Sequence, residues 1–158
     1  MRYLAIDYGE KHTGLAICDQ AEKIVSPLTV VEGRVRLLEE IDRLIKNENV
    51  EAIVLGLPLN MDDSKGPQAR AVLRLGQRLE QHFKIPVYFQ DERLTTFGAE
   101  QKLAERDFTR AQKRKRLDAF AAAEILQIFL DEKKHLTNRH SLHVKRGEGE
   151  KKRIADRG

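Results

Sequence analysis

Acidic side chains stand at three points of this chain where apolar segments begin or end. Asp7 closes one segment, Asp91 and Glu92 follow another at Pro86–Gln90, and Asp118 opens a helical pattern. Carboxylates are hard oxygen ligands suited to Mg²⁺ or Mn²⁺, which retain water and bind phosphate oxygens. Two such ions about 3.5–4 Å apart activate water and stabilise the leaving oxygen of an in-line displacement. If the three points converge, the chemistry they support is hydrolysis of a phosphodiester bond.

Asp118 is the most informative of these acids because its neighbours on the helix are apolar. It shares a face with Ala122, Ile125 and Phe129, at spacings of four, seven and eleven residues. That face should pack on a sheet, where an unpaired carboxylate is costly. The alternative is a first-turn acid that interacts with the helix dipole. The alanines between positions 119 and 123 are small enough to let the helix approach the strands and bring Asp118 to their ends.

Asp7 begins the pattern Asp-x-Gly-x-x-x-x-Gly, which continues through Gly9 and Gly14. Gly9 permits a tight turn after the strand, and Gly14 inside the next strand indicates a close backbone approach. An ordinary hairpin turn and the phosphate-binding hairpin of actin-like ATPases are the alternatives here. Asp91 and Glu92 repel each other unless a cation or an Arg lies nearby, and a solvated strand end is the alternative for them.

Basic and polar residues near these acids are candidates for contact with a substrate. They are Lys11, Asn60, Arg93, Lys113, Arg114, Lys115 and Arg116. The last four stand directly before Asp118, which places them at the mouth of the expected site, although a solvated loop would look the same. His135, His140 and His143 have no matching fourth ligand, and we expect no metal site there.

The net charge of +4 is unevenly distributed along the chain. Residues 133–158 carry nine Lys and Arg against three Asp and Glu, so the preceding part is slightly acidic. Residues 106–116 form a second basic run. A solvated tail is the ordinary interpretation of terminal charge. Two separate clusters nevertheless favour a polyanionic partner such as nucleic acid.

The composition indicates a soluble globular domain with room for a core. Of 158 residues, 41% are hydrophobic and 34% are charged. No run approaches the roughly 18 apolar residues of a membrane span, and Asp7 interrupts any secretory signal. Cys18 is the only cysteine, so no intrachain disulfide can form and we expect a cytoplasmic setting. We expect one domain over residues 1–132 and a basic, disordered tail over residues 133–158.

The order of the expected strands and helices predicts an α/β fold. Strands are expected at Arg2–Asp7, Thr13–Asp19, Ile24–Val31, Ala52–Leu57 and Pro86–Gln90, and helices at Val35–Asn47, Pro67–His82, Thr95–Glu105 and Leu117–Leu130. The first three strands form an antiparallel meander, and Pro27 assigns the third to an edge. Right-handed crossovers place the fourth and fifth parallel to the first, in the order 3-2-1-4-5 with helices on both faces. A five-stranded mixed sheet of this order is the ribonuclease H-like architecture.

Four blocks of the sequence resemble the YqgF family, also called RuvX. They are Asp7-Tyr8-Gly9-Glu10-Lys11-His12-Thr13-Gly14, Gly56-Leu57-Pro58-Leu59-Asn60-Met61, Asp91-Glu92-Arg93-Leu94-Thr95-Thr96 and Asp118-Ala119-Phe120-Ala121-Ala122, within residues 2–132. This family is described as a pre-16S ribosomal RNA nuclease and as a Holliday junction resolvase homologue. The resemblance implies a ribonuclease H-like fold, Mg²⁺ or Mn²⁺, the bacterial cytoplasm, and maturation of the 5′ end of small-subunit ribosomal RNA.

Two positions depart from the pattern of the family that the chain resembles. His12 stands where Arg is usual, and Asp63 stands where Gly is usual. We expect the first to weaken a phosphate contact and the second to change only the shape of a loop.

The middle carboxylate of the site is the least certain from geometry. In related resolvases it ends the fourth strand, where this chain has Gly56, and the fifth strand lies about 10 Å from the first. Glu92 reaches further than Asp91, so we prefer it as the working ligand. We therefore expect Asp7, Glu92 and Asp118 to be catalytic, with Asp91 as a further metal ligand.

Three other functions would use the same residues. A resolvase of four-way DNA junctions would be favoured by dimerisation, because symmetric cutting needs two sites. A non-catalytic nucleic-acid-binding module is supported by the basic clusters and opposed by retained metal binding. An actin-like ATPase needs two such domains around a nucleotide, and 158 residues supply one. The expected substrate is precursor ribosomal RNA or branched DNA, and we expect the protein to be a monomer or a homodimer.

Overall fold

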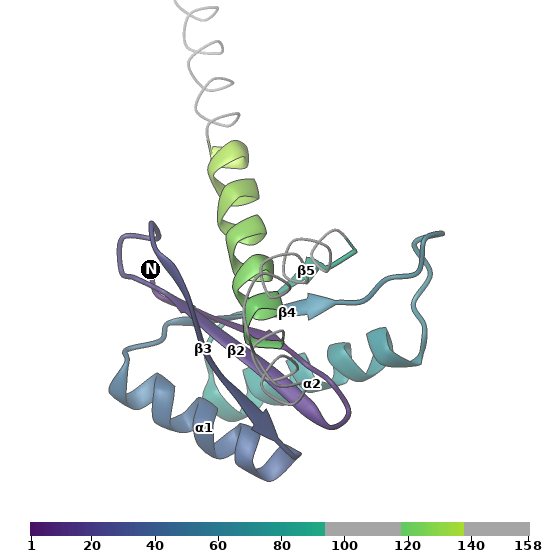
Figure 1. Cartoon of the computed structure of the whole chain (residues 1–158), viewed down its shortest axis with the longest axis horizontal. Helices are drawn as coiled ribbons and strands as arrows, with labels where there is room; N and C mark the ends of the chain where they lie inside the picture. Colours follow the sequence, from purple (N-terminus) through teal and green to yellow (C-terminus); the bar gives the residue numbers. More distant parts are fainter. Residues whose placement is uncertain (94–117, 138–158) are drawn as a thin grey trace, which may run out of the picture. The chain divides into compact units, whose positions relative to one another are not determined.

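The computed structural model describes residues 1–93 and 118–137. The first range contains the strands β1 (Tyr3–Asp7), β2 (His12–Cys18), β3 (Val25–Glu32), β4 (Ala52–Leu57) and β5 (Val87–Asp91), with the helices α1 (Arg34–Asn47) and α2 (Pro67–Phe83). A further helix covers residues 118–137, drawn in green in Figure 1. The chain divides into two compact units, Met1–Ile128 and Phe129–Gly158. The part of the green helix that belongs to the same unit as the strands is therefore residues 118–128.

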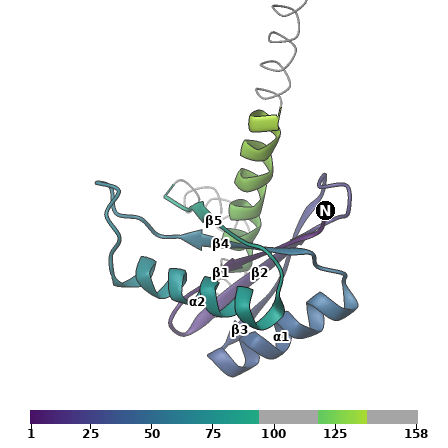
Figure 2. The same ribbon diagram turned by 180° about the vertical axis from the view of Figure 1, so that it is seen from behind.

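The strands form one mixed sheet in the order β3-β2-β1-β4-β5, which confirms the predicted order. β2 is antiparallel to β1 and β3, whereas β4 is parallel to β1 and β5 (Figure 2). Each strand begins and ends within one residue of its expected position. Because β1, β4 and β5 run parallel, their C-terminal ends lie along the same edge of the sheet. This edge carries Asp7 and the Asp91-Glu92 pair.

β3 occupies an outer edge of the sheet, as its proline predicted. The pairing with β2 passes from Leu15 opposite Thr29 to Ala16 opposite Pro27, so Leu28 is an extra residue in a β-bulge. Pro27 has no N–H to donate to a ladder, and an edge strand is where that loss is tolerated.

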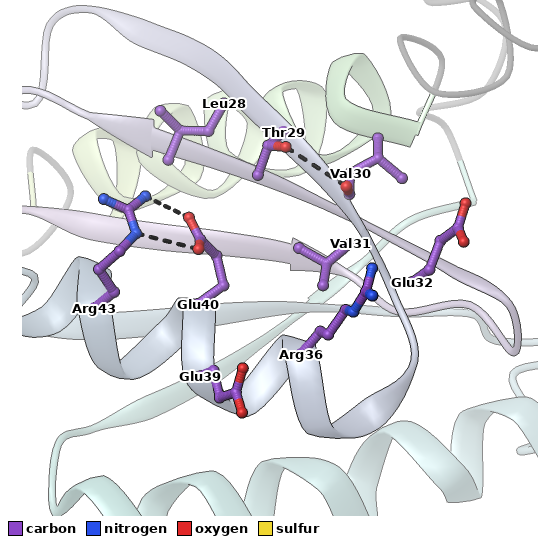
Figure 3. A pocket seen from close by; sticks show the side chains of 9 residues that line it. All are labelled: Leu28, Thr29, Val30, Val31, Glu32, Arg36, Glu39, Glu40 and Arg43. Atoms are coloured by element: carbon purple, nitrogen blue, oxygen red, sulfur yellow. Dashed lines mark hydrogen bonds and ion pairs between the residues drawn. The ribbon is translucent and has the colours of Figure 1, made fainter.

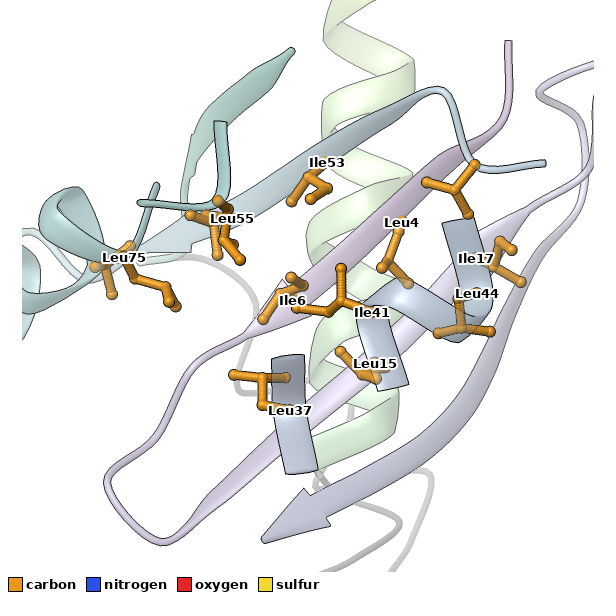
Figure 4. Close-up of a cluster of buried hydrophobic side chains, with 13 residues drawn as sticks. Leu4, Ile6, Leu15, Ile17, Leu37, Ile41, Leu44, Ile53, Leu55 and Leu75 are labelled. Carbon is orange, nitrogen blue, oxygen red and sulfur yellow. The ribbon is translucent and has the colours of Figure 1, made fainter. Parts of the chain in front are cut away.

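Alternation along the strands separates two faces of the sheet. One face carries the main apolar core, which is closed by α1 and α2 (Figure 4). On α1 the core residues Leu37, Ile41 and Leu44 recur at helical spacing and are buried. The strand residues of this face are Leu4, Ile6, Leu15, Ile17, Ile53 and Leu55. The opposite face presents small, fully buried side chains such as Ala5 and Ala16.

The helix of residues 118–128 lies against this small-residue face, so helices cover both faces as predicted. A Cβ atom on Gly14 would overlap the backbone oxygen of Asp118, which confirms the close approach expected at that glycine. A Cβ on Gly56 would lie 2.5 Å from Cδ1 of Ile125. Ala122 is fully buried. The two glycines and the alanines therefore set how near the helix comes to the strands.

The structure differs from the sequence-based expectation at the end of the helix. The helix was expected to end at Leu130, but it continues to residue 137. Apolar periodicity stops earlier, whereas Glu and Lys are good helix formers without any buried contact. The predicted helix Thr95–Glu105 and residues 138–158 lie outside the described residues. Within the described ranges, no helix combines the length and the apolar character needed to cross a bilayer.

Replacing Gly14 with Ala tests the closeness of this packing. The added Cβ meets the backbone of Asp118, which cannot rotate away as a side chain would. We expect Gly14→Ala to lower the free energy of unfolding by about 1–3 kcal/mol, the usual cost of overpacking. Gly66→Ala is the matched control, because the nearest atom to its Cβ is 3.6 Å away. We expect that control to change stability by less than about 1 kcal/mol. Urea denaturation measures both, and equal stabilities would contradict the close packing.

Candidate active site

Asp7 lies at the C-terminal end of β1, on the face covered by the helix of residues 118–128. Its partner in the antiparallel register with β2 is Gly14. The backbone of Asp118 lies directly against Gly14. Asp118 is thereby carried to Asp7, and its negative charge contributes to raising the pKa of Asp7. The packing of the helix thus brings together two acids that are far apart in sequence.

Glu92 reaches the same place from β5, across the intervening strand β4. Its carboxyl hydrogen-bonds with that of Asp7. The Oε2 atom of Glu92 lies 2.6 Å from the position that a Cβ on Gly56 would take, so the absent side chain leaves its path open. The backbone N–H of Glu92 donates to the carbonyl of Leu57 at 3.3 Å, which extends the pairing of β5 with β4 by one residue. A residue two strands away from Asp7 therefore reaches it over a glycine.

Burial and crowding raise the pKa of both hydrogen-bonded carboxyls. Desolvation is the largest cause for Asp7, whose pKa rises to about 6, and the charge of Asp118 follows. Desolvation also leads for Glu92, whose pKa rises to about 7, followed by the charge of Asp7 and the hydrogen bond with it. Near neutral pH and without a cation, the pair therefore shares a proton, with protonated Glu92 donating to Asp7.

Asp91 is adjacent to Glu92, but its carboxylate is engaged elsewhere. It accepts hydrogen bonds from Arg93, with Nε at 2.9 Å, Nη2 at 2.6 Å and the backbone nitrogen at 3.0 Å. The hydrogen bond from the Arg93 guanidinium holds the pKa of Asp91 below its ordinary value. Successive residues of a strand point in opposite directions, so only one of the two acids can face Asp7. The structure brings Glu92 to Asp7 and keeps Asp91 apart.

The Arg93 guanidinium also joins this strand end to the loop after β4. Its Nη1 donates to the backbone oxygen of Asn60 at 3.2 Å and to Oδ1 of Asp63 at 2.7 Å. Asp63 has a φ of 65°, the left-handed conformation that favours glycine. The expectation that Asp63 changes only the shape of the loop was therefore wrong, because its carboxylate also pairs with Arg93. Arg93 is committed here to two carboxylates and a carbonyl.

His12, the other departure, begins β2 and is paired with Glu32 of β3. Its Nδ1 lies 3.6 Å from Oε1 of Glu32 on the neighbouring strand β3. Nδ1 is buried and has no hydrogen-bond partner among the described residues. A weakened phosphate contact at this position stays a prediction.

The remaining predicted contact residues lie in different places. Lys11 is exposed in the turn between β1 and β2. The side-chain amide of Asn60 donates to Oγ of Ser64 at 2.9 Å, within the loop after β4. His135 is exposed near the end of the long helix. Lys113, Arg114, Lys115, Arg116, His140 and His143 lie outside the described residues.

The donor chemistry of the site suits a hard divalent cation. Among residues 1–93 and 118–137, no group of three or more His, Cys, Asp or Glu side chains is arranged to hold a metal ion. The carboxyls of Asp7 and Glu92 instead hydrogen-bond with each other, and the charge of Asp118 contributes to raising the pKa of Asp7. A cation would relieve the same repulsion that the proton relieves, and carboxylate oxygens are the ligands that Mg²⁺ and Mn²⁺ prefer. The residues present therefore fit such an ion chemically.

Comparison with known sequences identifies the family. A sequence model of RuvX, described as Holliday junction resolvase, matches residues 1–132. The chain belongs to the RuvX family. A relative from Caldanaerobacter subterraneus subsp. tengcongensis, named "Putative pre-16S rRNA nuclease", is 41% identical over 138 residues, which are 85% of this chain and 99% of the relative. A relative of the same name from Anaeromyxobacter sp. is 43% identical over 133 residues, which are 83% of this chain and 97% of the relative.

Solved structures show the fold of this RuvX family member at larger sequence distance. RuvC from T. thermophilus, in complex with a Holliday junction substrate, is similar with a TM-score of 0.51 at 16% identity, over 79% of this chain and 91% of that one. Fowlpox virus resolvase with Holliday junction DNA has a TM-score of 0.50 at 12% identity, over 84% and 98%. The predicted ribonuclease H-like fold, which these resolvases share, is confirmed.

Two features of the RuvX site were missed by sequence reasoning. The open path over Gly56 had a signal, since a glycine inside the buried strand Ala52–Leu57 weakens that strand and marks a close approach. The pairing of Asp63 with Arg93 had none, because it depends on a loop conformation that no periodicity predicts.

Neutralising Glu92 and Asp91 should change the stability of the metal-free protein in opposite directions. The raised pKa values of Asp7 and Glu92 mean that the folded protein holds a proton that the unfolded chain releases. The contribution of these two acids to the free energy of unfolding is therefore complete below about pH 4 and falls as pH rises through about 7. Glu92→Gln keeps a donor to Asp7 without the charge, so we expect a higher melting temperature than wild type at pH 8 and little difference at pH 5.

Asp91→Asn is the matched substitution at the next position. The lowered pKa of Asp91 means that its ionised form contributes stability at both pH values through Arg93. We expect a lower melting temperature at pH 5 and at pH 8. Thermal unfolding in EDTA measures both variants, and a shift in the same direction at pH 8 would contradict the assignment of the two acids.

Proposed function

We propose that this RuvX family member is a metal-dependent nuclease that hydrolyses phosphodiester bonds in the maturation of the 5′ end of pre-16S ribosomal RNA. The observation that carries the proposal is the hydrogen bond between the carboxyls of Asp7 and Glu92 at the C-terminal edge of the parallel strands, with the charge of Asp118 near enough to raise the pKa of Asp7. Open α/β sheets bind their ligands at this edge. The names of the relatives support the choice of substrate. A ribosomal RNA substrate and a buried, free Cys18 favour a cytoplasmic setting.

Asp7, Glu92 and Asp118 are the residues that would hold Mg²⁺ or Mn²⁺. When bound, such ions supply activation of water and stabilisation of the leaving oxygen at the scissile phosphate. The chain supplies carboxyls with raised pKa values, and their protons would have to leave for a cation to bind. Asp91, paired with Arg93, is proposed to position Glu92 rather than to bind the ion.

Phosphates on either side of the cut would be held by basic residues around this edge. Lys11 is exposed in the turn that directly follows Asp7. The run Lys113–Arg116 precedes Asp118 in sequence. Arg93, with Asn60 beside it, could contact the substrate only if Asp63 released its guanidinium. The chain therefore holds its substrate chiefly through contacts with the phosphate backbone, and these carry little sequence information.

A resolvase acting on four-way DNA junctions is the second candidate. The description of the RuvX family favours it, and the two resolvase structures have the same fold. This function would need a homodimer that presents two sites to the junction, whereas a monomer suffices for cutting precursor RNA.

The first functional prediction concerns the metal and the substrate. Purified protein should cleave precursor 16S ribosomal RNA with Mg²⁺ or Mn²⁺ and stop on addition of EDTA, because the acids need cations to act on phosphate. A four-way DNA junction in the same assay identifies the alternative. Cleavage of the junction alone would favour the resolvase, cleavage that persists in EDTA would contradict the metal site, and binding without cleavage would leave a nucleic-acid-binding module.

The second functional prediction separates a catalytic Asp118 from a helix-dipole acid. Asp118→Asn keeps the shape and removes the charge that offsets a cation, so we expect cleavage to fall by orders of magnitude. Metal-free stability should hold or rise, because the crowded acids repel less. Asp7→Asn should behave alike, and the double variant should lose little more, since the ligands act as one unit.

Asp42→Asn is the control for Asp118→Asn, because Asp42 is a half-buried acid of α1 that pairs with Lys46, far along the chain from the candidate site. We expect it to leave the cleavage rate unchanged. The measurements are cleavage rate at saturating Mn²⁺ and melting temperature in EDTA. A near-normal rate for Asp118→Asn, with a stability loss of about 0.3–1 kcal/mol, would support the helix-dipole account instead.

A further inference from the structure

A basic groove lies between α1 and α2, on the side of the sheet opposite to Asp7. It has a volume of about 440 Å³. Its charged and aromatic lining consists of Arg34 at the start of α1 and Arg74, Arg78 and His82 along α2. Leu38 and Leu75 contribute the apolar part of the lining. None of the described residues that line the groove is acidic.

The arginines of this groove form no ion pair with another described residue, whereas Arg43 of α1 does. Within the part of the chain that the structure describes, no ion pair involves Arg34, Arg74 or Arg78. The groove on the other side of α1, between α1 and β3, shows the contrast (Figure 3). There Nε of Arg43 donates to Glu40 at 3.1 Å. The basic groove therefore presents uncompensated charge, whereas its neighbour is neutralised from within.

The spacing of the arginines suits a chain of phosphates. Arg74 and Arg78 are one turn apart on α2, which separates their backbone positions by about 6 Å. Arg34 adds a third guanidinium from α1, so both helices contribute positive charge to the groove. The stems of arginines also cover apolar surface such as Leu38, and that use alone would explain their position. It would not explain why three arginines line one groove with no acid among its described lining residues, an arrangement that suits phosphate oxygens.

We propose that the groove between α1 and α2 is a second binding site for nucleic acid, which holds the phosphate backbone of the substrate away from the carboxylates that cut it. The identity of the polyanion rests on the proposed function, whereas the anion-binding groove does not. Because α1 and α2 cover the face opposite to Asp7, only a substrate long enough to pass around the domain reaches both places. Contacts with the backbone bind without regard to sequence.

The test is the salt dependence of RNA binding by full-length protein in EDTA, where binding is measured without cleavage. Arg74→Gln combined with Arg78→Gln removes two phosphate contacts. For single-stranded RNA we expect the slope of log affinity against log salt to become shallower by about 1.4. Arg74→Lys combined with Arg78→Lys keeps both charges and should retain most of the slope. Lys23→Gln combined with Lys84→Gln removes the same charge elsewhere on the surface and should leave the slope near wild type.

Cleavage of two RNAs separates this inference from the proposed function. A short RNA that spans only the scissile bond should be cut equally by wild type and the Gln double variant, while a long precursor should be cut with a higher KM by the variant. An unchanged slope and KM for the long RNA, or an effect equal to that of the lysine control, would overturn the inference while nuclease activity stands. The inference would also be overturned if the Gln double variant lost binding of inorganic phosphate but kept its affinity for RNA, because the groove would then bind a small anion. A third outcome is that the variant binds RNA more weakly while the wild type cleaves neither RNA. That result would support the binding groove and contradict the proposed nuclease activity.

Discussion

The close contact between the helix of residues 118–128 and the sheet determines the rest of the site. The backbone of Asp118 rests on Gly14, and Gly14 is paired across the sheet with Asp7. A side chain at Gly14 would push the helix outward and separate the two acids. Gly56 on β4 has the same effect, because its missing side chain leaves room for both Ile125 and the carboxyl of Glu92. Two missing side chains thus leave room for the backbone of Asp118 and for the carboxyl of Glu92.

Crowded acids lower the free energy of unfolding, and other interactions within the domain must offset that loss. The two neighbouring acids at the end of β5 illustrate two ways to do so, since burial raises the pKa of Glu92 and Arg93 lowers that of Asp91. The first acid is half-buried and hydrogen-bonded to Asp7. The second is held in its ionised form by Arg93, which also joins the strand end to the loop after β4. Adjacent residues of the same charge therefore serve opposite purposes because a strand points them to opposite sides.

Much of the fold followed from periodicity and handedness alone. Alternating strands, amphipathic helices and right-handed crossovers predicted the sheet order, since each rule constrains a long stretch of chain. The close approach at Gly14 was also predictable, because a glycine inside a strand needs a reason. The extent of the helix beyond Leu130 was not, because exposed helix leaves no apolar pattern. The pairing of Asp63 with Arg93 could not be foreseen either, since it joins a left-handed loop residue to a strand end 30 residues later.

The edge strand β3 also limits how the molecule can associate. An open edge offers unpaired backbone groups to any other strand, and two identical edges can join into a continuous sheet. Here Pro27 removes a donor from the middle of the edge, and the bulge at Leu28 changes the spacing of the remaining groups. Ile24 and Leu28 are exposed on or beside this strand and would otherwise add apolar attraction. The same residues that end the sheet therefore protect a concentrated solution of the protein against growth of ordered aggregates through β3.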